Sequence, residues 1–461
     1  MNRRDFIKTG SALVASSLLS PSLSSYSKVQ GEKSMNSELP NILFIFSDQQ
    51  RHDTYGEQDR FHADTPFMNR LAETGVQFRQ AFCSCPQCSP SRATLQTGLY
   101  PTQAQVVGNM GNPSDPLPTS LKTIGRRMQE RGYRTAYMGK WHLGGEIGDY
   151  GYDYVMKGHG DELAAQEACS YLAGTVDPRP FFQIVSFVDP HDIYKLNKDP
   201  NVDRPPASDV WASQSDTLET KPWPQKHFRD FDQGKPLSHF RDEDWEYYRR
   251  FYASKVEKVD RYLGQILDAL GQLGQSSNTW IFFTSDHGDL CGAHRLPFKC
   301  PAMYDDLVRI PLIIAPPKGG SFDPCDVMTN NIDIVPTIMS IAGIPEDPSL
   351  TGQSLLPLVT RGGEYEESDA IYSQYHQKQR WAAPVRMIRT KKWKYNVYIK
   401  HGVELYNLES DPHEMRNLVH DPDYRDIRDE LHEKLVAHID SIGDPFFTFK
   451  ATDRSGKELN D

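Results

Sequence analysis

The sequence of 461 residues has no apolar run long enough to cross a lipid bilayer. The run near the N-terminus, Ala12–Leu19, is short and contains serine. A membrane-spanning helix needs about 20 mostly apolar residues. No later segment is long and apolar enough either, so the sequence predicts no stable membrane anchor.

Basic residues are not concentrated in any one part of the chain. The sequence has 51 Lys and Arg against 62 Asp and Glu, a net charge of −11, and the two signs are mixed along the chain. A nucleic-acid-binding protein needs a clustered basic face, so we expect no nucleic-acid partner. An acidic chain that handles an anion must create positive charge locally, from a metal ion and a few basic side chains.

Cysteines are few, and their number, seven, is odd. At least one therefore stays outside any set of intramolecular disulfides. Cys83, Cys85 and Cys88 lie close together, but no second Cys/His cluster at zinc spacing accompanies them, which argues against zinc. Cys291 and Cys300 are close enough in sequence to pair, and the sequence leaves that question open.

The N-terminal segment is basic before it becomes apolar. Arg3-Arg4, followed by Phe6-Ile7-Lys8, resembles a twin-arginine export signal, and a serine-rich stretch to about Ser37 has the composition of a linker. The alternative is a basic disordered tail. We expect residues 1–38 to be an export signal and linker, and the protein to be periplasmic or secreted.

Several short runs are apolar on both faces, which is typical of central strands in a parallel sheet. Helical stripes separate them, with apolar side chains stepping by three and four between Trp245 and Leu270. The sequence therefore predicts an α/β fold with a central, mostly parallel sheet flanked by helices. The expected strands are 41–46, 134–138, 181–188, 280–285 and 309–316.

The pattern changes past residue 368. Four short alternating runs between Ala370 and Leu408 suit a small antiparallel sheet, and residues 423–442 carry a helical stripe. We therefore expect a catalytic domain at 39–367 and a C-terminal α+β subdomain at 368–461, with an antiparallel sheet and one helix. There are no internal repeats.

Polar side chains follow three of the expected strands. Asp48-Gln49, His191 and Asp286-His287 lie just past strand ends, where open α/β sheets place their ligands. The oxygen donors with one imidazole favour Ca²⁺ or Mg²⁺ over zinc. Alternatively, Asp48 is a helix cap or turn residue and His191 a surface-loop histidine.

The most informative segment runs from Cys88 to Gly98. Pro90 suits a first helical turn and Gly98 can close the helix, so Cys88 lies at or just before a helix N-terminus that favours an anion. Arg92, one turn on, can point back to the same place. The alternative is a buried structural cysteine beside a capping serine.

The order Cys-x-Pro-Ser-Arg, followed by Leu-x-Thr-Gly, resembles the signature of the type I sulfatases, which belong to the alkaline phosphatase-like superfamily. Gly139–Gly144 (GKWHLG), Ser285–Gly288 (SDHG) and Glu404–Leu408 resemble further segments of that family, and the similarity extends over about residues 40–418. The resemblance implies that Cys88 is converted to Cα-formylglycine by a formylglycine-generating or anaerobic sulfatase-maturating enzyme. It also implies one bound Ca²⁺.

In that family the aldehyde acts as a hydrate: one hydroxyl attacks sulfur, and the other expels sulfate. The resemblance implies that Asp286 accepts the proton of the attacking hydroxyl and that His191 or Lys299 protonates the leaving oxygen. His142 would assist the step in which the hydrate returns to the aldehyde and expels sulfate.

Lys140 and His142, two apart on an extended segment, should point to one face. The implied catalytic residues are Cys88, Arg92, Lys140, His142, His191, Asp286 and Lys299, with Arg92, Lys140 and Lys299 holding the sulfate. The implied metal ligands are Asp48, Gln49, Cys88, Asp286 and His287.

Two features bear on the substrate. Relatives usually have two carboxylates where this chain has Asp48-Gln49, which opens a phosphonate, phosphodiester or choline-sulfate alternative. The segment 194–239 has no clear period, and we expect it to line the substrate pocket, with Trp211, Trp223 and His227 as sugar contacts. Export and these aromatic residues favour a sulfated saccharide. A non-catalytic binder of sulfated glycans is the alternative from another class, if Cys88 is not modified.

Overall fold

The computed structural model describes residues 39–111, 115–157, 160–174, 177–198 and 207–459, and residues 39–461 form one compact unit. The expected export signal and linker lie outside the described residues. Within the described ranges, no helix has the length and apolar character needed to cross a membrane.

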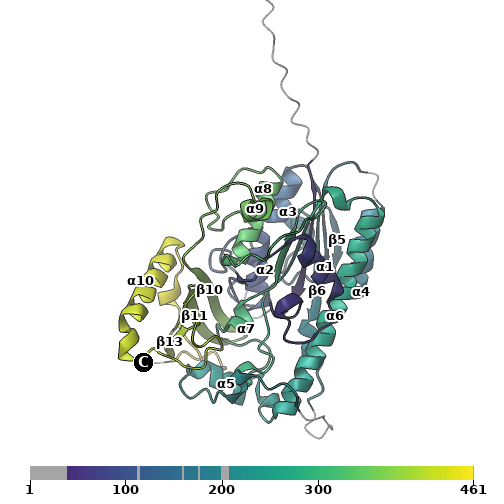
Figure 1. The fold of residues 1–461 in the computed structure, drawn as a ribbon. Helices are drawn as coiled ribbons and strands as arrows, with labels where there is room; N and C mark the ends of the chain where they lie inside the picture. The colour runs from purple at the N-terminus through teal and green to yellow at the C-terminus, as the bar shows by residue number, and fades with distance from the viewer. Residues whose placement is uncertain (1–38, 112–114, 158–159, 175–176, 199–206, 460–461) are drawn as a thin grey trace, which may run out of the picture. The chain divides into compact units, whose positions relative to one another are not determined.

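A seven-stranded sheet organises the chain (Figure 1), in the order β2-β8-β7-β1-β6-β4-β5. β1 lies between β6 and β7 and runs parallel to both, and β4 runs parallel to β5 and β6, whereas β8 is antiparallel to β7 and β2. The strands are β1 (Asn41–Asp48), β2 (Val76–Gln77), β4 (Arg134–Gly139), β5 (Tyr154–Lys157), β6 (Phe181–Pro190), β7 (Thr279–Ser285) and β8 (Leu312–Ala315).

Helices cover both faces of this sheet because the strands are apolar on both sides. In β1, Leu43 and Ile45 pack toward one helical layer, and Phe44 and Phe46 toward the other. Alternate side chains of one strand thereby serve two cores. The first layer contains α1 (Pro66–Thr74), α4 (Asp161–Ala173) and α6 (Asp242–Gln272); the second contains α2 (Cys88–Thr97), α3 (Ile124–Glu130) and α8 (Ile334–Ile341).

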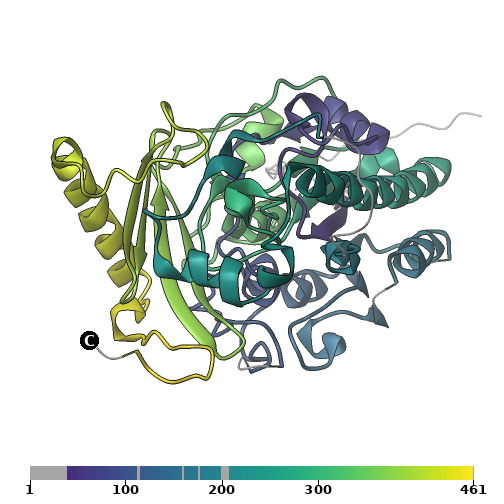
Figure 2. The same ribbon diagram turned by 90° about the horizontal axis from the view of Figure 1, so that it is seen from below.

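The C-terminal part adds a four-stranded antiparallel sheet in the order β10-β11-β12-β13. α10 (Arg425–Ser441) packs on one face of this sheet through Leu431, Leu435 and Ile439, and Figure 2 shows it on the outer side. The opposite face packs onto the part that contains the seven-stranded sheet, where Trp381 joins the first core and Met387 the second. The strands are β10 (Ile371–Lys378), β11 (Trp381–Arg389), β12 (Trp393–Tyr398) and β13 (Gly402–Asn407).

The predicted fold class is confirmed, including the antiparallel C-terminal sheet with its helix. The division at residue 368 stays a prediction. The described residues of segment 194–239 include α5 (Trp223–Phe231), which the lack of a clear period in the sequence did not indicate. Four further short elements are β3 (Ala81–Phe82), β9 (Thr329–Asn330), α7 (Asp305–Val308) and α9 (Leu356–Thr360).

All seven cysteines are free, so Cys291 and Cys300 are not paired.

Candidate active site

Cys88 is the first residue of α2, as the sequence predicts. Gln87 is the extended residue before the helix, and Pro90 fits the first turn, where its missing N–H is not needed. Gly98 ends the helix in the left-handed region, with φ of 73°, and its N–H bonds to the Thr94 carbonyl. All ten residues of α2 are buried, so the helix tip is fixed inside the protein.

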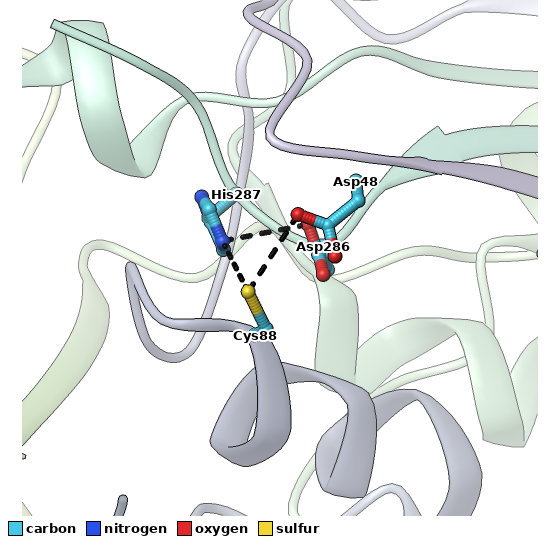
Figure 3. A group of neighbouring side chains, drawn as sticks. All are labelled: Asp48, Cys88, Asp286 and His287. Atoms are coloured by element: carbon cyan, nitrogen blue, oxygen red, sulfur yellow. Dashed lines mark hydrogen bonds and ion pairs between the residues drawn. The ribbon is translucent and has the colours of Figure 1, made fainter. Parts of the chain in front are cut away.

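Four potential metal-binding side chains converge at this helix tip (Figure 3). Asp48 ends β1, while Asp286 and His287 follow the neighbouring β7, and the register that pairs Ser47 with Ser285 brings them together. Cys88 Sγ lies 3.3 Å from His287 Nε2 and 3.6 Å from Asp48 Oδ1. One ligand atom from each of the four lies within 4.8 Å of the others, and all four residues are buried.

Gln49 lies at the edge of this group in a left-handed conformation, with φ of 71°. Its Oε1 accepts a hydrogen bond from Lys299 Nζ at 2.7 Å, and its Nε2 donates to Asp289 Oδ2 at 2.6 Å. Asp289 also accepts from the Tyr248 hydroxyl at 3.0 Å. Asp289 therefore orients Gln49. The sequence showed only an acidic residue beside Gly288 and did not indicate this role.

The donor set fits a hard divalent cation. Two carboxylates and the Gln49 carbonyl supply oxygen, and His287 supplies one nitrogen. Ca²⁺ and Mg²⁺ favour oxygen ligands. Burial, followed by repulsion from Asp48, raises the pKa of Asp286. Two adjacent buried carboxylates of this kind would be further stabilised by a bound cation.

Arg92 occupies a different position from the one expected of a sulfate-binding group. Its Nε donates to Asp286 Oδ2 and its Nη2 to Asp48 Oδ2, both at 2.8 Å. Its Nη1 donates to the Lys140 carbonyl at 2.8 Å and to Ser186 Oγ at 2.7 Å. The side chain is 1% exposed. Because all three nitrogens are engaged by protein, Arg92 fixes the two carboxylates rather than facing an anion.

Two lysines supply the positive charge near Cys88. Lys299 Nζ lies 2.8 Å from Cys88 Sγ and 3.1 Å from His287 Nε2, and Lys140 Nζ lies 2.6 Å from Asp48 Oδ2. Burial raises the pKa of the Cys88 thiol, but Lys299 and then Lys140 outweigh it and hold that pKa well below its ordinary value. Residue 88 therefore lies in a strongly electropositive environment, although the whole chain is acidic.

His142 and His191 both lie near this centre, but the backbone at His142 differs from the extended conformation that was predicted. β4 ends at Gly139, and His142 is left-handed with φ of 58°, so the extended segment predicted for Lys140–His142 is wrong. The His142 side chain nevertheless contacts Cys88 and helps to lower the pKa of its thiol. His191 directly follows β6, and its ring lies 4.9 Å from that of Tyr194. Burial and Cys88 oppose ionisation of Asp48, but Lys140, His191 and Arg92 hold the pKa of Asp48 well below its usual value.

The C-terminal sheet contributes a further cation that the sequence did not indicate. Lys378, at the end of β10, donates from Nζ to the Lys299 carbonyl at 2.8 Å and lies 4.5 Å from the centre of the Phe228 ring. Burial lowers its pKa to about 8. Among the residues that the structure describes, no carboxylate lies within 4 Å of Nζ. Only the fold, which sets β10 against the catalytic part, reveals this residue.

Trp211 is not available as a sugar contact. It is 3% exposed, and the guanidinium groups of Arg51, Arg60 and Arg249 lie over its ring, so it belongs to the core. Trp223 is 44% exposed, and its ring stacks on that of His227 with centres 4.2 Å apart. Of the three residues expected to contact a sugar in segment 194–239, Trp211 is therefore excluded, and Trp223 and His227 remain.

The arrangement suits nucleophilic chemistry on an anion. A residue at a helix tip faces Lys299, and two carboxylates and His287 can hold a cation beside it. Positive groups that are already in position before the reaction stabilise the negative charge that develops on the transferred group. The geometry therefore brings together all the expected catalytic and metal-binding residues, with Arg92 behind the carboxylates.

Comparisons with known proteins agree with this geometry. A family model described as Sulfatase matches residues 40–344, and one described as N-sulphoglucosamine sulphohydrolase, C-terminal, matches residues 292–441. The chain is 30% identical over 459 residues to the uncharacterized sulfatase YidJ of Escherichia coli (strain K12), covering 89% of each chain.

Two further relatives are similar over nearly their full lengths. The Delta 4,5-hexuronate-2-O-sulfatase of Bacteroides thetaiotaomicron is 27% identical, over 91% of this chain and 93% of the relative. The solved structure of BT1596, a 2-O GAG sulfatase, has a TM-score of 0.84 at 26% identity, over 90% of this chain and 95% of that chain. The chain therefore belongs to the sulfatase family, has the alkaline phosphatase-like fold, and is a sulfuric ester hydrolase.

Proposed function

We propose that this protein hydrolyses a sulfate monoester on a sulfated saccharide. One observation carries the proposal: Cys88, at the tip of α2, lies 2.8 Å from Lys299 Nζ and within a group of metal-binding side chains. The saccharide part rests on relatives named as a hexuronate-2-O-sulfatase and a 2-O GAG sulfatase.

We further propose that residue 88 is converted to Cα-formylglycine and that the site holds Ca²⁺. Asp48, Gln49, Asp286, His287 and residue 88 would hold the ion. When present, the modified residue supplies a hydroxyl nucleophile and the ion binds and polarises the sulfate oxygens. The burial of Asp48, Cys88, Asp286 and His287 supports this proposal, because buried carboxylates are stabilised by a paired cation.

The protein's own side chains have separate tasks in this proposal. Lys299 and Lys140 bind and orient the sulfate, because both ammonium groups lie at the centre. Asp286 accepts a proton from the nucleophile, because its carboxylate is buried beside residue 88. His191 or Lys299 gives a proton to the leaving oxygen, and His142, beside Cys88, assists the release of sulfate. Arg92 holds Asp48 and Asp286 in place.

The proposal extends to the life of the chain in the cell. We propose that residues 1–38 direct export to the periplasm or outside the cell. A formylglycine-generating or anaerobic sulfatase-maturating enzyme would be a transient partner. We also propose residues 39–367 as the catalytic domain and 368–461 as the C-terminal subdomain, with Lys378 as a residue of the second part that reaches the site.

The experiment has two arms. Mass spectrometry of the peptide that contains residue 88 should show loss of the thiol mass and the mass of formylglycine in active preparations. A panel of defined sulfated mono- and disaccharides should identify a substrate, with Cys88→Ala as the inactive control. An unmodified thiol in preparations with full activity would contradict the mechanism, whereas formylglycine without saccharide turnover would contradict only the substrate class.

The alternative reaction is favoured by Asp48-Gln49, which leaves the metal group with one negative charge fewer than a pair of carboxylates. A choline-sulfatase of Rhizobium meliloti is also similar, at 27% identity over 84% of each chain. The same panel should therefore include choline sulfate, a phosphonate monoester and a phosphodiester. A larger kcat/KM for any of these than for the best sulfated saccharide would favour that alternative.

A further inference from the structure

A second charged cavity lies away from Cys88, between the loop after β1, α7 and the end of β11. We call it the arginine cavity; its volume is about 470 Å³. None of Asp48, Cys88, Asp286 and His287 lines it. Figure 1 shows α7 beside the C-terminal sheet, and Arg389, at the end of β11, lines the cavity. The polar lining residues are Arg51, His52, Asp53, Gln58, Arg60, Gln80, Asp305, Asp306, Arg309, Arg389, Lys391 and His413.

Positive charge exceeds negative charge in this lining. Four arginines and one lysine line the cavity with three aspartates, and the lysine, Lys391, is paired with Glu367 outside the lining. The aspartates are already engaged. Arg51 Nη2 lies 2.7 Å from Asp53 and 2.6 Å from Asp306, and Arg389 Nη2 lies 2.9 Å from Asp305. Arg60 lies 3.9 Å from Asp53, and Lys391 pairs with Glu367 at 2.8 Å, so Arg309 is the lining cation with no carboxylate within 4 Å among the described residues.

Arg309 is the least compensated of these cations. Its Nε donates to the Arg79 carbonyl at 2.7 Å, and its Nη2 also donates to that carbonyl. In the described part of the chain, no carboxylate lies within 4 Å of its guanidinium, and Nη1 makes no hydrogen bond to protein. Burial, with further repulsion from Arg389, lowers the pKa of Arg309, although Asp305 opposes this. A largely buried cation without a paired anion is costly, and an anion in the cavity would remove that cost.

The cavity also offers a neutral donor. His52 Nδ1 is buried and has no hydrogen-bond partner in the described residues. Burial, and then Arg309, lowers the pKa of His52 to about 3, so the ring is neutral and one ring nitrogen carries a proton. Arg60, whose guanidinium is 3.9 Å from Asp53, faces the same space. Arg309, Arg60 and His52 all line the cavity, so each offers a donor to an anion with several oxygens.

We propose that the arginine cavity binds a tetrahedral oxyanion at a site separate from the catalytic centre. The anion is either free sulfate or phosphate, or a sulfate group carried by a larger substrate, and the recognition chemistry is the same. Planar guanidinium groups bind such oxyanions with two parallel hydrogen bonds. The proposal does not depend on the reaction at Cys88.

Binding there has a direct path to the catalytic loop. Arg51 Nη1 donates to the Asp289 carbonyl at 2.8 Å, and the Asp289 carboxylate accepts from Gln49 Nε2 at 2.6 Å. An anion that neutralises the cavity therefore stabilises Asp289 and, through it, Gln49, the residue that follows β1. The expected sign is an increase in Tm when the anion binds.

The first test measures Tm of the full, metal-loaded protein with sodium sulfate or phosphate at millimolar concentration and constant ionic strength. The parent protein should gain Tm, and Arg309→Met should need about tenfold more anion for the same gain. Lys391→Met should weaken the response less than Arg309→Met, because Lys391 is 62% exposed and already pairs with Glu367 at 2.8 Å. Arg79→Met is the matched control, because Arg79 lies outside the cavity and pairs with the exposed Asp326.

The second test locates the anion and separates its two sources. Crystals soaked in selenate should show anomalous density beside Arg309 if the free ion binds. If only a substrate-borne sulfate binds, selenate is absent there, but Arg309→Met raises KM for a multiply sulfated saccharide and not for a monosulfated one. The proposal is overturned if Arg309→Met and Lys391→Met behave like Arg79→Met in the Tm assay, selenate does not enter the cavity, and KM is unchanged for both saccharides.

Discussion

Replacing Arg92 tests whether one buried guanidinium holds the active site together. Arg92 is 1% exposed, and it lies 2.8 Å from a carboxylate oxygen of both Asp48 and Asp286. Arg92→Met keeps most of the side-chain volume but leaves two adjacent buried carboxylates without this counter-charge. Lys140 still contacts Asp48, at 2.6 Å, whereas Asp286 keeps no arginine or lysine partner among the described residues.

Removing one partner of a buried ion pair costs about 3–5 kcal/mol, because the other charge stays buried. We therefore expect Arg92→Met to lower the free energy of unfolding by about that amount when metal is chelated. An exposed pair contributes about 0–1 kcal/mol. Arg79→Met is the control, because Arg79 and Asp326 are 31% and 62% exposed and lie 2.5 Å apart.

Urea denaturation of the parent protein and both variants, with EDTA and then with excess Ca²⁺, measures these differences. Calcium should recover part of the loss in Arg92→Met, because a bound cation neutralises the same two carboxylates, and it should not change the small loss in Arg79→Met. Equal losses in the two variants, or a larger loss for Arg92→Met when calcium is added, would refute the reasoning.

Three other perturbations address the chemistry. Lys299→Met should lower kcat about 100-fold or more with little change in the urea midpoint, since Lys299 Nζ lies 2.8 Å from residue 88 and makes no ion pair to lose among the described residues. Lys378→Met should raise KM severalfold, and because burial lowers the pKa of Lys378 to about 8, KM of the parent protein should rise above pH 8 as the ammonium loses its proton, a rise that the variant should lack. Chelation of metal should abolish turnover and lower Tm, and Ca²⁺ should restore both; full activity after exhaustive chelation would exclude the metal site from catalysis.

The fold class and five strands of the large sheet could be predicted, because these strands are short runs apolar on both faces, whereas β2 and β5 were not predicted. Ile42–Phe46 has no polar side chain, so it can only lie between two helical layers, and the structure buries all five of its residues. The neighbouring Asp48 and the pair Asp286-His287 could be brought together from sequence for the same reason. Adjacent parallel strands deliver their C-terminal residues to one edge.

The roles of individual side chains could be predicted less well from the sequence, because they depend on contacts between distant segments. Arg92 turns toward Asp48 and Asp286, which lie 44 and 194 residues away, and no local spacing encodes that choice. His142 reaches Cys88 through a left-handed backbone that a two-residue period does not predict. Trp211 looked like a surface aromatic residue in a polar segment, but three arginines from other segments cover it.

The burial of α2 also orders the steps that the proposed function requires. Cys88 is 0% exposed, and Ser89, Pro90 and Ser91 around it are buried as well. An enzyme that modifies Cys88 needs the backbone on both sides of it, so modification must come before this helix packs against Asp286 and Lys299. If residues 1–38 act as the proposed twin-arginine signal, which carries folded chains, modification and folding would both precede export. The packing that would make residue 88 reactive therefore also keeps the proposed modifying enzyme from reaching it in the folded protein.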